Sequence, residues 1–241
     1  MTGHNIESSP QVYARIAGVF YLLESLTAVF GQFFVLGRLV VHGDTAATAA
    51  NILGHEPLMR LGFASSLMAV AFHIAWALLF YELLKPVNRH VSSLATFVIL
   101  VGCAIQALAS LLYLAPLLVL ANGSSLSAFT PEQLQALAFV FLKLNGQAFN
   151  IYLAFFGFWC VLVGYLIFKS TFLPRVIGLL MVFAGLGYLT LLSAPLANYL
   201  YPFNMAIAGP GEISLLLWLF VKGVNVRKWK EKAGVWPGGQ E

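Results

Sequence analysis

The stretch LATFVILVGCAIQALASLLYLAPLLVL, residues 94–120, contains no charged side chain, and its last ten residues, 111–120, are apolar on all sides. An α-helix rises about 1.5 Å per residue, so roughly 20 residues cross the ~30 Å hydrocarbon core of a bilayer. Backbone N–H and C=O groups find no water there, which leaves helices or closed barrels as spanning structures. A barrel strand would alternate polar and apolar residues over about ten positions, and this stretch does not. It therefore predicts a transmembrane helix.

Five further stretches have a similar length and composition: residues 16–36, 61–84, 147–168, 176–196 and 205–221. The whole chain is 60% hydrophobic and 9% charged, with a mean hydropathy of +0.87, whereas soluble domains carry about 25% charged residues. The sequence thus predicts an all-α, polytopic integral membrane protein. We expect one transmembrane domain over residues 1–241, a six-helix bundle that ends in a basic cytoplasmic tail, residues 222–241. The first span lacks a preceding basic cluster and a small-residue cleavage site, so it is expected to be retained.

The basic residues indicate the orientation. With both termini in the cytoplasm, ten of the 13 Lys and Arg residues lie on the inner side, as expected from the positive-inside rule. The inner ten are Arg15, Lys85, Arg89, Lys169, Arg175, Lys222, Arg227, Lys228, Lys230 and Lys232; the outer three are Arg38, Arg60 and Lys143. This predicts a multi-pass protein of the inner (cytoplasmic) membrane. The tail around Trp229 is predicted to contact anionic lipid headgroups rather than nucleic acid.

Two outer segments carry helix-start signals. Asp44 is expected to cap a short extra helix on the outer face that Gly54 and Pro57 end. Thr130 and Pro131 fit the cap and first position of a helix, so the fourth helix is predicted to begin outside the membrane. In the fifth span, glycines predict close helix contact through small faces: Gly178, Gly185 and Gly187.

Motifs of soluble enzymes are not found in this sequence. It contains no zinc-type Cys/His spacing, Walker loop, GxSxG elbow or HExxH pair, so no cofactor is expected. Cys103 and Cys160 both fall inside predicted spans, where small buried thiols are the ordinary interpretation.

Three polar residues fall near the middle of the first three spans: Glu24, His73 and Gln106. An ionised carboxylate at the bilayer centre costs about 2.5 to 3.5 kcal/mol, so Glu24 should face other helices and pair, most obviously with His73. One interpretation is a hydrogen-bonded cluster that fixes helix packing, at about 0.6 kcal/mol per bond. The other is a proton-accepting site, since Glu and His at this depth occur in proton relays.

A second polar set lies toward the outer ends of the spans, where it could bind a ligand: Gln32, Asn145, Gln147, Asn150 and Glu212. Glu212 follows Gly209-Pro210-Gly211, which predicts a kink in the sixth span or a helix that starts there. In the second case Glu212 would occupy a helix N-terminus, which favours negative charge. The hypothesis is an outward-facing polar pocket for an unknown small molecule; the alternative is a kink with an interfacial carboxylate.

An ordered set of short segments resembles a bacterial membrane-protein family catalogued as domain of unknown function 4386. The segments are Ala14-Arg-Ile-Ala-Gly18, residues 48–53 with Glu56 and Arg60-Leu-Gly62, Pro86-Val-Asn88, Phe155-Phe-Gly157, Gly164-Tyr-Leu166, Leu173-Pro-Arg175, Gly185-Leu-Gly-Tyr188, and Gly211-Glu212 with Trp218. The resemblance covers nearly the whole chain, from about Ala14 to Gly223. The resemblance implies a six-helix bacterial membrane protein and implies no reaction.

Three positions depart from the family pattern. The resemblance implies a carboxylate where Gln32 stands and histidines where Asn145 and Trp159 stand, whereas Glu212 matches. If relatives use these side chains to bind a metal or move protons, the neutral amides here offer only hydrogen bonds. No metal site is therefore expected in this chain.

Three classes of function remain open. A non-catalytic membrane component is placed first, because no nucleophile, cofactor motif or metal set is found. A small-molecule or proton-coupled carrier would need a polar cavity open to one side. A membrane enzyme acting on a lipid-soluble substrate would need an acid/base pair, for which Glu24 with His73, or Glu212, could serve.

Overall fold

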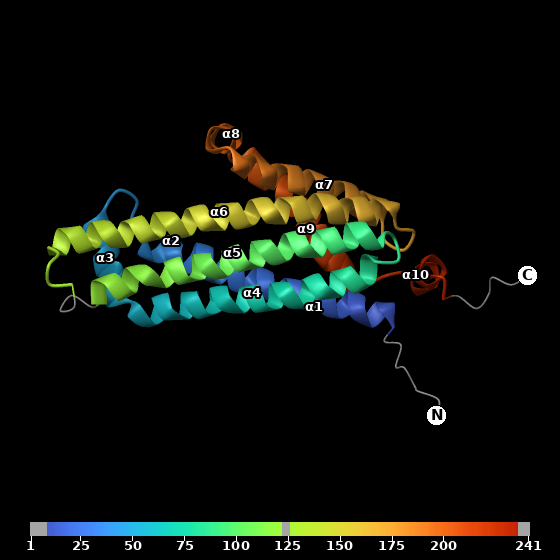
Figure 1. The fold of residues 1–241 in the computed structure, drawn as a ribbon, viewed down its shortest axis with the longest axis horizontal. Coiled ribbons are helices and arrows are strands. Elements are labelled where there is room, and N and C mark those ends of the chain that lie inside the picture. The colour runs from blue at the N-terminus through green and yellow to red at the C-terminus, as the bar shows by residue number, and fades with distance from the viewer. Residues whose placement is uncertain (1–8, 122–125, 236–241) are drawn as a thin grey trace, which may run out of the picture. The chain divides into compact units, whose positions relative to one another are not determined.

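The computed structural model describes residues 9–121 and 126–235, and these contain helices and no strand (Figure 1). Six helices are long and apolar enough to cross a membrane: Pro10–Leu39, Glu56–Leu84, Arg89–Ala121, Pro131–Lys169, Arg175–Leu192 and Phe203–Val221. The predicted all-α, multi-pass membrane protein is thereby confirmed. Residues 236–241 of the predicted tail lie outside the described part.

The chain divides into two compact units. Unit 1 comprises Met1–Leu22, Ile74–Val101 and Leu153–Glu241, and unit 2 comprises Leu23–His73 and Gly102–Tyr152. Four helices contribute residues to both units: α1 (Pro10–Ala28), α4 (Glu56–Leu84), α5 (Arg89–Ala121) and α6 (Pro131–Lys169). Unit 1 also holds α7 (Arg175–Leu189), η2 (Thr190–Leu192), α8 (Ala194–Leu200), α9 (Phe203–Val221) and α10 (Val226–Ala233). Unit 2 also holds η1 (Val29–Val35), α2 (Leu36–Leu39) and α3 (Thr45–Gly54). The single bundle stays a prediction.

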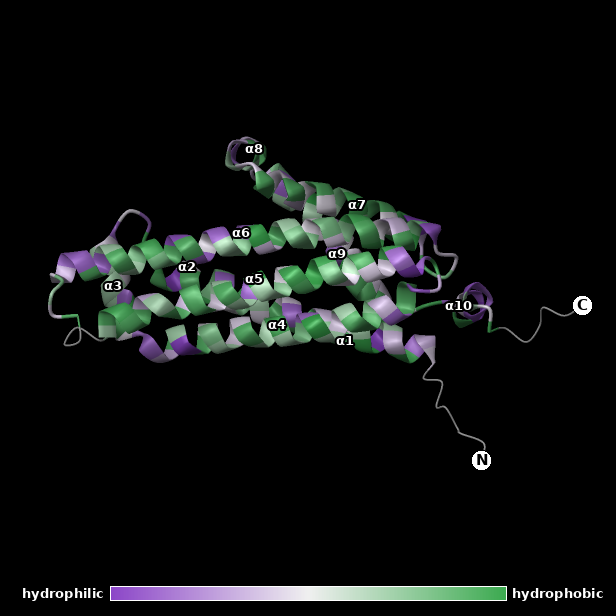
Figure 2. Cartoon of the chain, in the orientation of Figure 1, coloured by the Kyte–Doolittle hydropathy of each residue, from purple (hydrophilic) through white to green (hydrophobic). Residues whose placement is uncertain are grey.

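Large apolar side chains cover the exposed faces of the long helices. Phe97 on α5 is 69% exposed and Val176 on α7 is 67% exposed. Figure 2 shows the hydrophobic colour along the long helices and the hydrophilic colour on α10. So much exposed apolar surface would be a liability in water and is what lipid chains cover.

Glycines bring the helices of unit 1 into backbone contact, as the sequence predicts. A Cβ atom added at Gly178 would lie 2.7 Å from the Gly164 carbonyl oxygen, and one added at Gly185 would lie 2.6 Å from that of Gly157. These two pairs join α6 to α7, so the small faces allow an approach that any larger residue would block.

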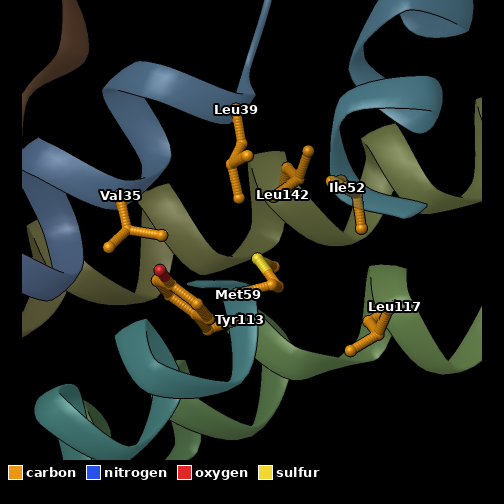
Figure 3. Close-up of a cluster of buried hydrophobic side chains, with 7 residues drawn as sticks. All are labelled: Val35, Leu39, Ile52, Met59, Tyr113, Leu117 and Leu142. Carbon is orange, nitrogen blue, oxygen red and sulfur yellow. The ribbon is translucent and has the colours of Figure 1, made fainter. Parts of the chain in front are cut away.

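Unit 2 has a separate apolar core (Figure 3) built by η1, α2, α3, α4, α5 and α6. Its buried members are Val35, Leu39, Ile52, Met59, Tyr113, Leu117 and Leu142. Ile52 and Met59 are fully buried, because α3 closes over this core with its apolar face. The short helix α3 is therefore a packed part of unit 2.

Both predicted helix starts are confirmed. Asp44 caps α3, since its carboxylate accepts a 2.8 Å hydrogen bond from the Ala47 amide. Before α6, the Thr130 amide donates to Gln133 Oε1 at 2.9 Å and the Gln133 amide donates to Thr130 Oγ1 at 3.4 Å. This reciprocal pair is a capping box.

The fifth span is shorter than predicted, and the sixth excludes one of the two alternatives at Pro210. The fifth ends at Leu192 instead of Leu196, because Ser193 is extended and Pro195 then opens the separate helix α8. The sixth is one helix, α9, with Pro210 inside it. Glu212 therefore lies well within α9, and the idea that it occupies a helix N-terminus is wrong.

Candidate functional site

Glu24 and His73 lie together in unit 2. Glu24 on α1 is 7% exposed and His73 on α4 is fully buried, and Glu24 Oε1 lies 3.7 Å from His73 Nδ1. The same ring nitrogen lies 3.2 Å from the hydroxyl of Tyr152 on α6. At 3.7 Å the first contact fits an ion pair but is too long for a hydrogen bond, whereas the second fits a hydrogen bond.

One imidazole nitrogen thus faces an acid and a phenol. When Nδ1 carries no proton, it accepts from the Tyr152 hydroxyl; when it is protonated, it donates to Tyr152 or faces the Glu24 carboxylate. Direct transfer between Glu24 and His73 requires the atoms to close from 3.7 Å to about 2.8 Å. A rotamer change would provide that closure, and a bridging water would relay the proton without it.

The third residue of the mid-span set, Gln106, is also buried in unit 2, at 3% exposure. Its backbone carbonyl accepts a 3.0 Å hydrogen bond from Ser110 Oγ. Its side-chain Oε1, like the hydroxyl of the buried Ser66, has no hydrogen-bond partner among the described residues. Buried polar atoms are normally paired, so each of these two oxygens can still accept a bond from water or a solute.

A π-helical segment, η1, continues from α1 and carries Gln32, which is half-buried. One turn widens here, and the Gly31 carbonyl accepts a 3.1 Å hydrogen bond from the buried Tyr113 hydroxyl. Such π segments often occur at functional positions.

The three amides of α6 have different surroundings. Asn145 is buried, and its Nδ2 donates a 2.8 Å hydrogen bond to the Ala109 carbonyl of α5. Gln147 is exposed and Asn150 is half-buried. Asn145 therefore joins two helices through their backbone, which is the packing interpretation of a neutral amide at this position.

Glu212 belongs to unit 1, whereas the other four residues of the outer polar set belong to unit 2. A pocket formed by all five residues therefore stays a prediction. The Tyr188 hydroxyl donates to Glu212 Oε1, and the Tyr21 hydroxyl donates to Glu212 Oε2 at 3.3 Å. Both carboxylate oxygens thus have a donor from a neighbouring helix, which explains how a carboxylate is tolerated in the middle of α9.

An aromatic cluster lies in the same unit. Trp159 is 1% exposed; its ring centroid lies 4.7 Å from that of Trp76 and 5.5 Å from that of Phe156. Tyr21 continues the cluster beyond Trp76, and Tyr188 continues it beyond Phe156. The two tyrosines that hold Glu212 are therefore fixed by ring packing.

The profile of a family described as Domain of unknown function (DUF4386) matches residues 16–223. The chain belongs to this family. No curated protein and no solved structure matches the chain. Within this member of DUF4386, Trp159 belongs to an aromatic cluster, and Asn145 donates a hydrogen bond to a backbone carbonyl. No group of three His, Cys, Asp or Glu side chains that could hold a metal ion occurs within residues 9–121 and 126–235.

Sequence reasoning missed Tyr152 and the two tyrosines at Glu212. Tyr152 had a usable signal, since it lies seven residues after Asn145 and so on the same face of α6. Tyr21 had none, because 191 residues separate it from Glu212 along the chain.

Proposed function

We propose that this chain is a non-catalytic membrane protein that binds a proton at Glu24 and His73 and passes it through its apolar interior. One observation carries the proposal: Glu24 Oε1 and Tyr152 OH both lie beside His73 Nδ1, at 3.7 Å and 3.2 Å, on buried positions of three helices. Ionisable residues within transmembrane helices commonly mark proton pathways.

The energies of the two charge states of the Glu24–His73 pair are close. Each charged side chain at the bilayer centre costs about 2.5 to 3.5 kcal/mol, so an ion pair costs about 5 to 7 kcal/mol before attraction. Opposite charges about 4 Å apart recover roughly 4 kcal/mol at an effective dielectric constant of 20. In water a proton prefers histidine to glutamate by about two pKa units, roughly 3 kcal/mol, which offsets the remaining cost of the ion pair. One proton can therefore move between the two groups at moderate cost.

The test is proton flux in liposomes that contain the purified protein. An acid pulse outside, with the membrane potential clamped by potassium and valinomycin, is followed by a pH dye inside. We expect wild type to equilibrate faster than empty liposomes, and Glu24→Gln and His73→Gln to fall to the empty-liposome rate. Glu56→Gln is the control, because Glu56 is exposed and pairs with Arg60.

Two outcomes contradict the proposal. One is a wild-type rate equal to that of empty liposomes. The other is a failure of both Glu24→Gln and His73→Gln to assemble in the membrane, which would assign the pair to helix packing alone. Size-exclusion chromatography of each variant distinguishes lost flux from lost folding.

A proton-coupled carrier of a small molecule is the second candidate, favoured by the unpartnered oxygens of Ser66 and Gln106. A solute that donates hydrogen bonds would satisfy them, and the five outer polar residues remain our hypothesis for its entrance. Mass spectrometry of solutes that copurify with the protein tests this. A carrier should retain a solute that Gln106→Leu loses and Gln135→Leu keeps, because Gln135 belongs to neither polar set; equal retention by both variants would argue against it.

We further propose that both termini face the cytoplasm at the inner membrane. The distribution of basic residues supports this orientation, as does the 2.8 Å hydrogen bond from Trp229 Nε1 to the Leu83 carbonyl, since it holds α10 beside the link from α4 to α5. Cysteines placed at Lys85 and Lys228 should react with an impermeant reagent from the cytoplasmic side, and one at Lys143 from the opposite side. Labelling of Lys85→Cys and Lys228→Cys from opposite faces would overturn the topology.

A further inference from the structure

A pocket of about 730 Å³ lies in unit 1 where α1 begins, α4 ends and α5 begins. Tyr13 lines it from α1, Lys85 from the link between α4 and α5, Arg89 from the start of α5, and Trp229 and Lys230 from α10. Its volume is within the range of pockets that hold small ligands, about 300 to 1,000 Å³.

The wall formed by α10 is fixed to the rest of unit 1. Trp229 Nε1 donates to the Leu83 carbonyl at 2.8 Å, and the Asn225 amide donates to the Phe172 carbonyl at 3.1 Å. At the start of α1, the Gln11 side chain donates to the Lys222 carbonyl at 2.8 Å and accepts from the Val224 amide at 2.9 Å. The basic tail is thus a docked helix that closes a pocket.

The charged side chains that line the pocket are all basic. Its described lining contains four cations and no carboxylate: Lys85, Arg89, Lys230 and Lys232. Lys85 also pairs with Glu82. On α10, Glu231 pairs with Arg227, and neither of these two residues lines the pocket. The pocket therefore retains the charge to bind an anionic group, and lysine and arginine are the usual donors to phosphate oxygens.

The surroundings favour a lipid as the source of that anion. Tyr13, Tyr81 and Trp229 line the pocket, and aromatic rings with a polar edge are typical of the headgroup level of a bilayer. Immediately along α1, Val12 is 47% exposed and Ile16 is 41% exposed, which provides an apolar surface for acyl chains. A lipid can place its phosphate among the cations and its chains along these side chains.

We propose that this pocket binds one anionic phospholipid through its phosphate, with Arg89 and Lys230 as the principal donors from two different helices. The interaction is a defined site, in contrast to a diffuse attraction of the basic tail to the membrane surface. It is independent of the proton site in unit 2.

The experiment is native mass spectrometry of the full-length protein in detergent, titrated with phosphatidylglycerol and, separately, with phosphatidylcholine. We expect phosphatidylglycerol to bind more tightly. Arg89→Gln and Lys230→Gln should each weaken its binding about fivefold, the effect of one basic residue at an anionic surface. Lys228→Gln is the matched control, because Lys228 has the same charge on the same helix and does not line the pocket.

Three results would overturn the proposal. Equal losses in Lys228→Gln and Lys230→Gln would show diffuse attraction, and equal binding of the two lipids would show that the cations are not used. Displacement of the lipid by glycerol 3-phosphate at equal concentration would assign the pocket to a soluble phosphate. Trp229→Phe gives an independent check: it removes the bond to Leu83, so it should weaken phosphatidylglycerol binding while circular dichroism of the helices is unchanged.

Discussion

The substitution Gly164→Ala tests the packing of unit 1 with a contact whose geometry is known. A Cβ at Gly164 would lie 2.7 Å from the Gly178 carbonyl oxygen and 2.9 Å from the Val182 amide nitrogen. Both atoms belong to the backbone of α7, so no side chain can move aside. Ordinary van der Waals contacts begin near 3.4 Å, whereas this contact would be 2.7 Å. The helices α6 and α7 must therefore move apart to accept the added methyl group. Separation would also open the neighbouring contact of Gly157 with Gly185.

Overpacking of this kind costs about 1 to 3 kcal/mol. Replacement of glycine by alanine within a helix also stabilises by about 1 kcal/mol, which would hide part of that cost. Gly146→Ala on the same helix removes the ambiguity, because a Cβ there meets nothing within 4 Å. The difference between the two variants should therefore be about 1 to 3 kcal/mol, with Gly164→Ala the less stable.

The assay is reversible unfolding of each variant by sodium dodecyl sulfate in mixed micelles, followed by circular dichroism. Gly164→Ala should unfold at a lower detergent fraction than wild type, and Gly146→Ala at an equal or higher one. If the two variants unfold at the same detergent fraction, the close approach of α6 and α7 does not contribute to the stability of the protein.

Two further predictions concern single hydrogen bonds. Asp44→Ala should speed hydrogen exchange across α3, since loss of a cap costs about 0.5 to 2 kcal/mol, whereas Asp44→Asn should retain slow exchange; equal exchange in both would exclude the cap. Tyr188→Phe should destabilise the protein by about 0.6 kcal/mol, and at most about 1.7 kcal/mol, because Glu212 Oε1 loses its donor. In the same unfolding assay Tyr21→Phe should cost less, because its bond is longer at 3.3 Å, and the reverse order would contradict the geometry.

The fold could be predicted where local chemistry decides it. Apolar length determines the six spans, and the side chains of Asp44 and Thr130 determine two helix starts within their own first turns. The π-helical turn at η1 could not be predicted, because it depends on how Gly31 packs in unit 2 and on the Tyr113 hydroxyl that bonds its carbonyl. At Pro210 the sequence left two alternatives, a kink or a helix start, and only the structure excludes the second, because α9 continues through the proline.

The candidate site shows the same division. The free-energy cost of an ionisable side chain at the centre of a bilayer identifies Glu24 and His73 as residues that should pair. The structure places Glu24 Oε1 and His73 Nδ1 3.7 Å apart. Tyr152 depends on which face of α6 turns toward α4, which composition does not encode. The pocket beside α10 depends on the bond from Trp229 to Leu83, 146 residues away along the chain, so the sequence shows only a charged tail.

Infrared spectroscopy of the carboxyl group measures directly whether Glu24 exchanges a proton inside the membrane. Difference spectra of the protein in liposomes, recorded on a pH step, should contain the C=O stretch of a protonated, buried carboxylic acid. Because Glu212 is a second carboxyl group within a span, Glu24→Gln is compared with Glu212→Gln. We expect Glu24→Gln to lose a pH-dependent band that Glu212→Gln keeps. A spectrum that Glu24→Gln leaves unchanged at every pH would contradict this expectation.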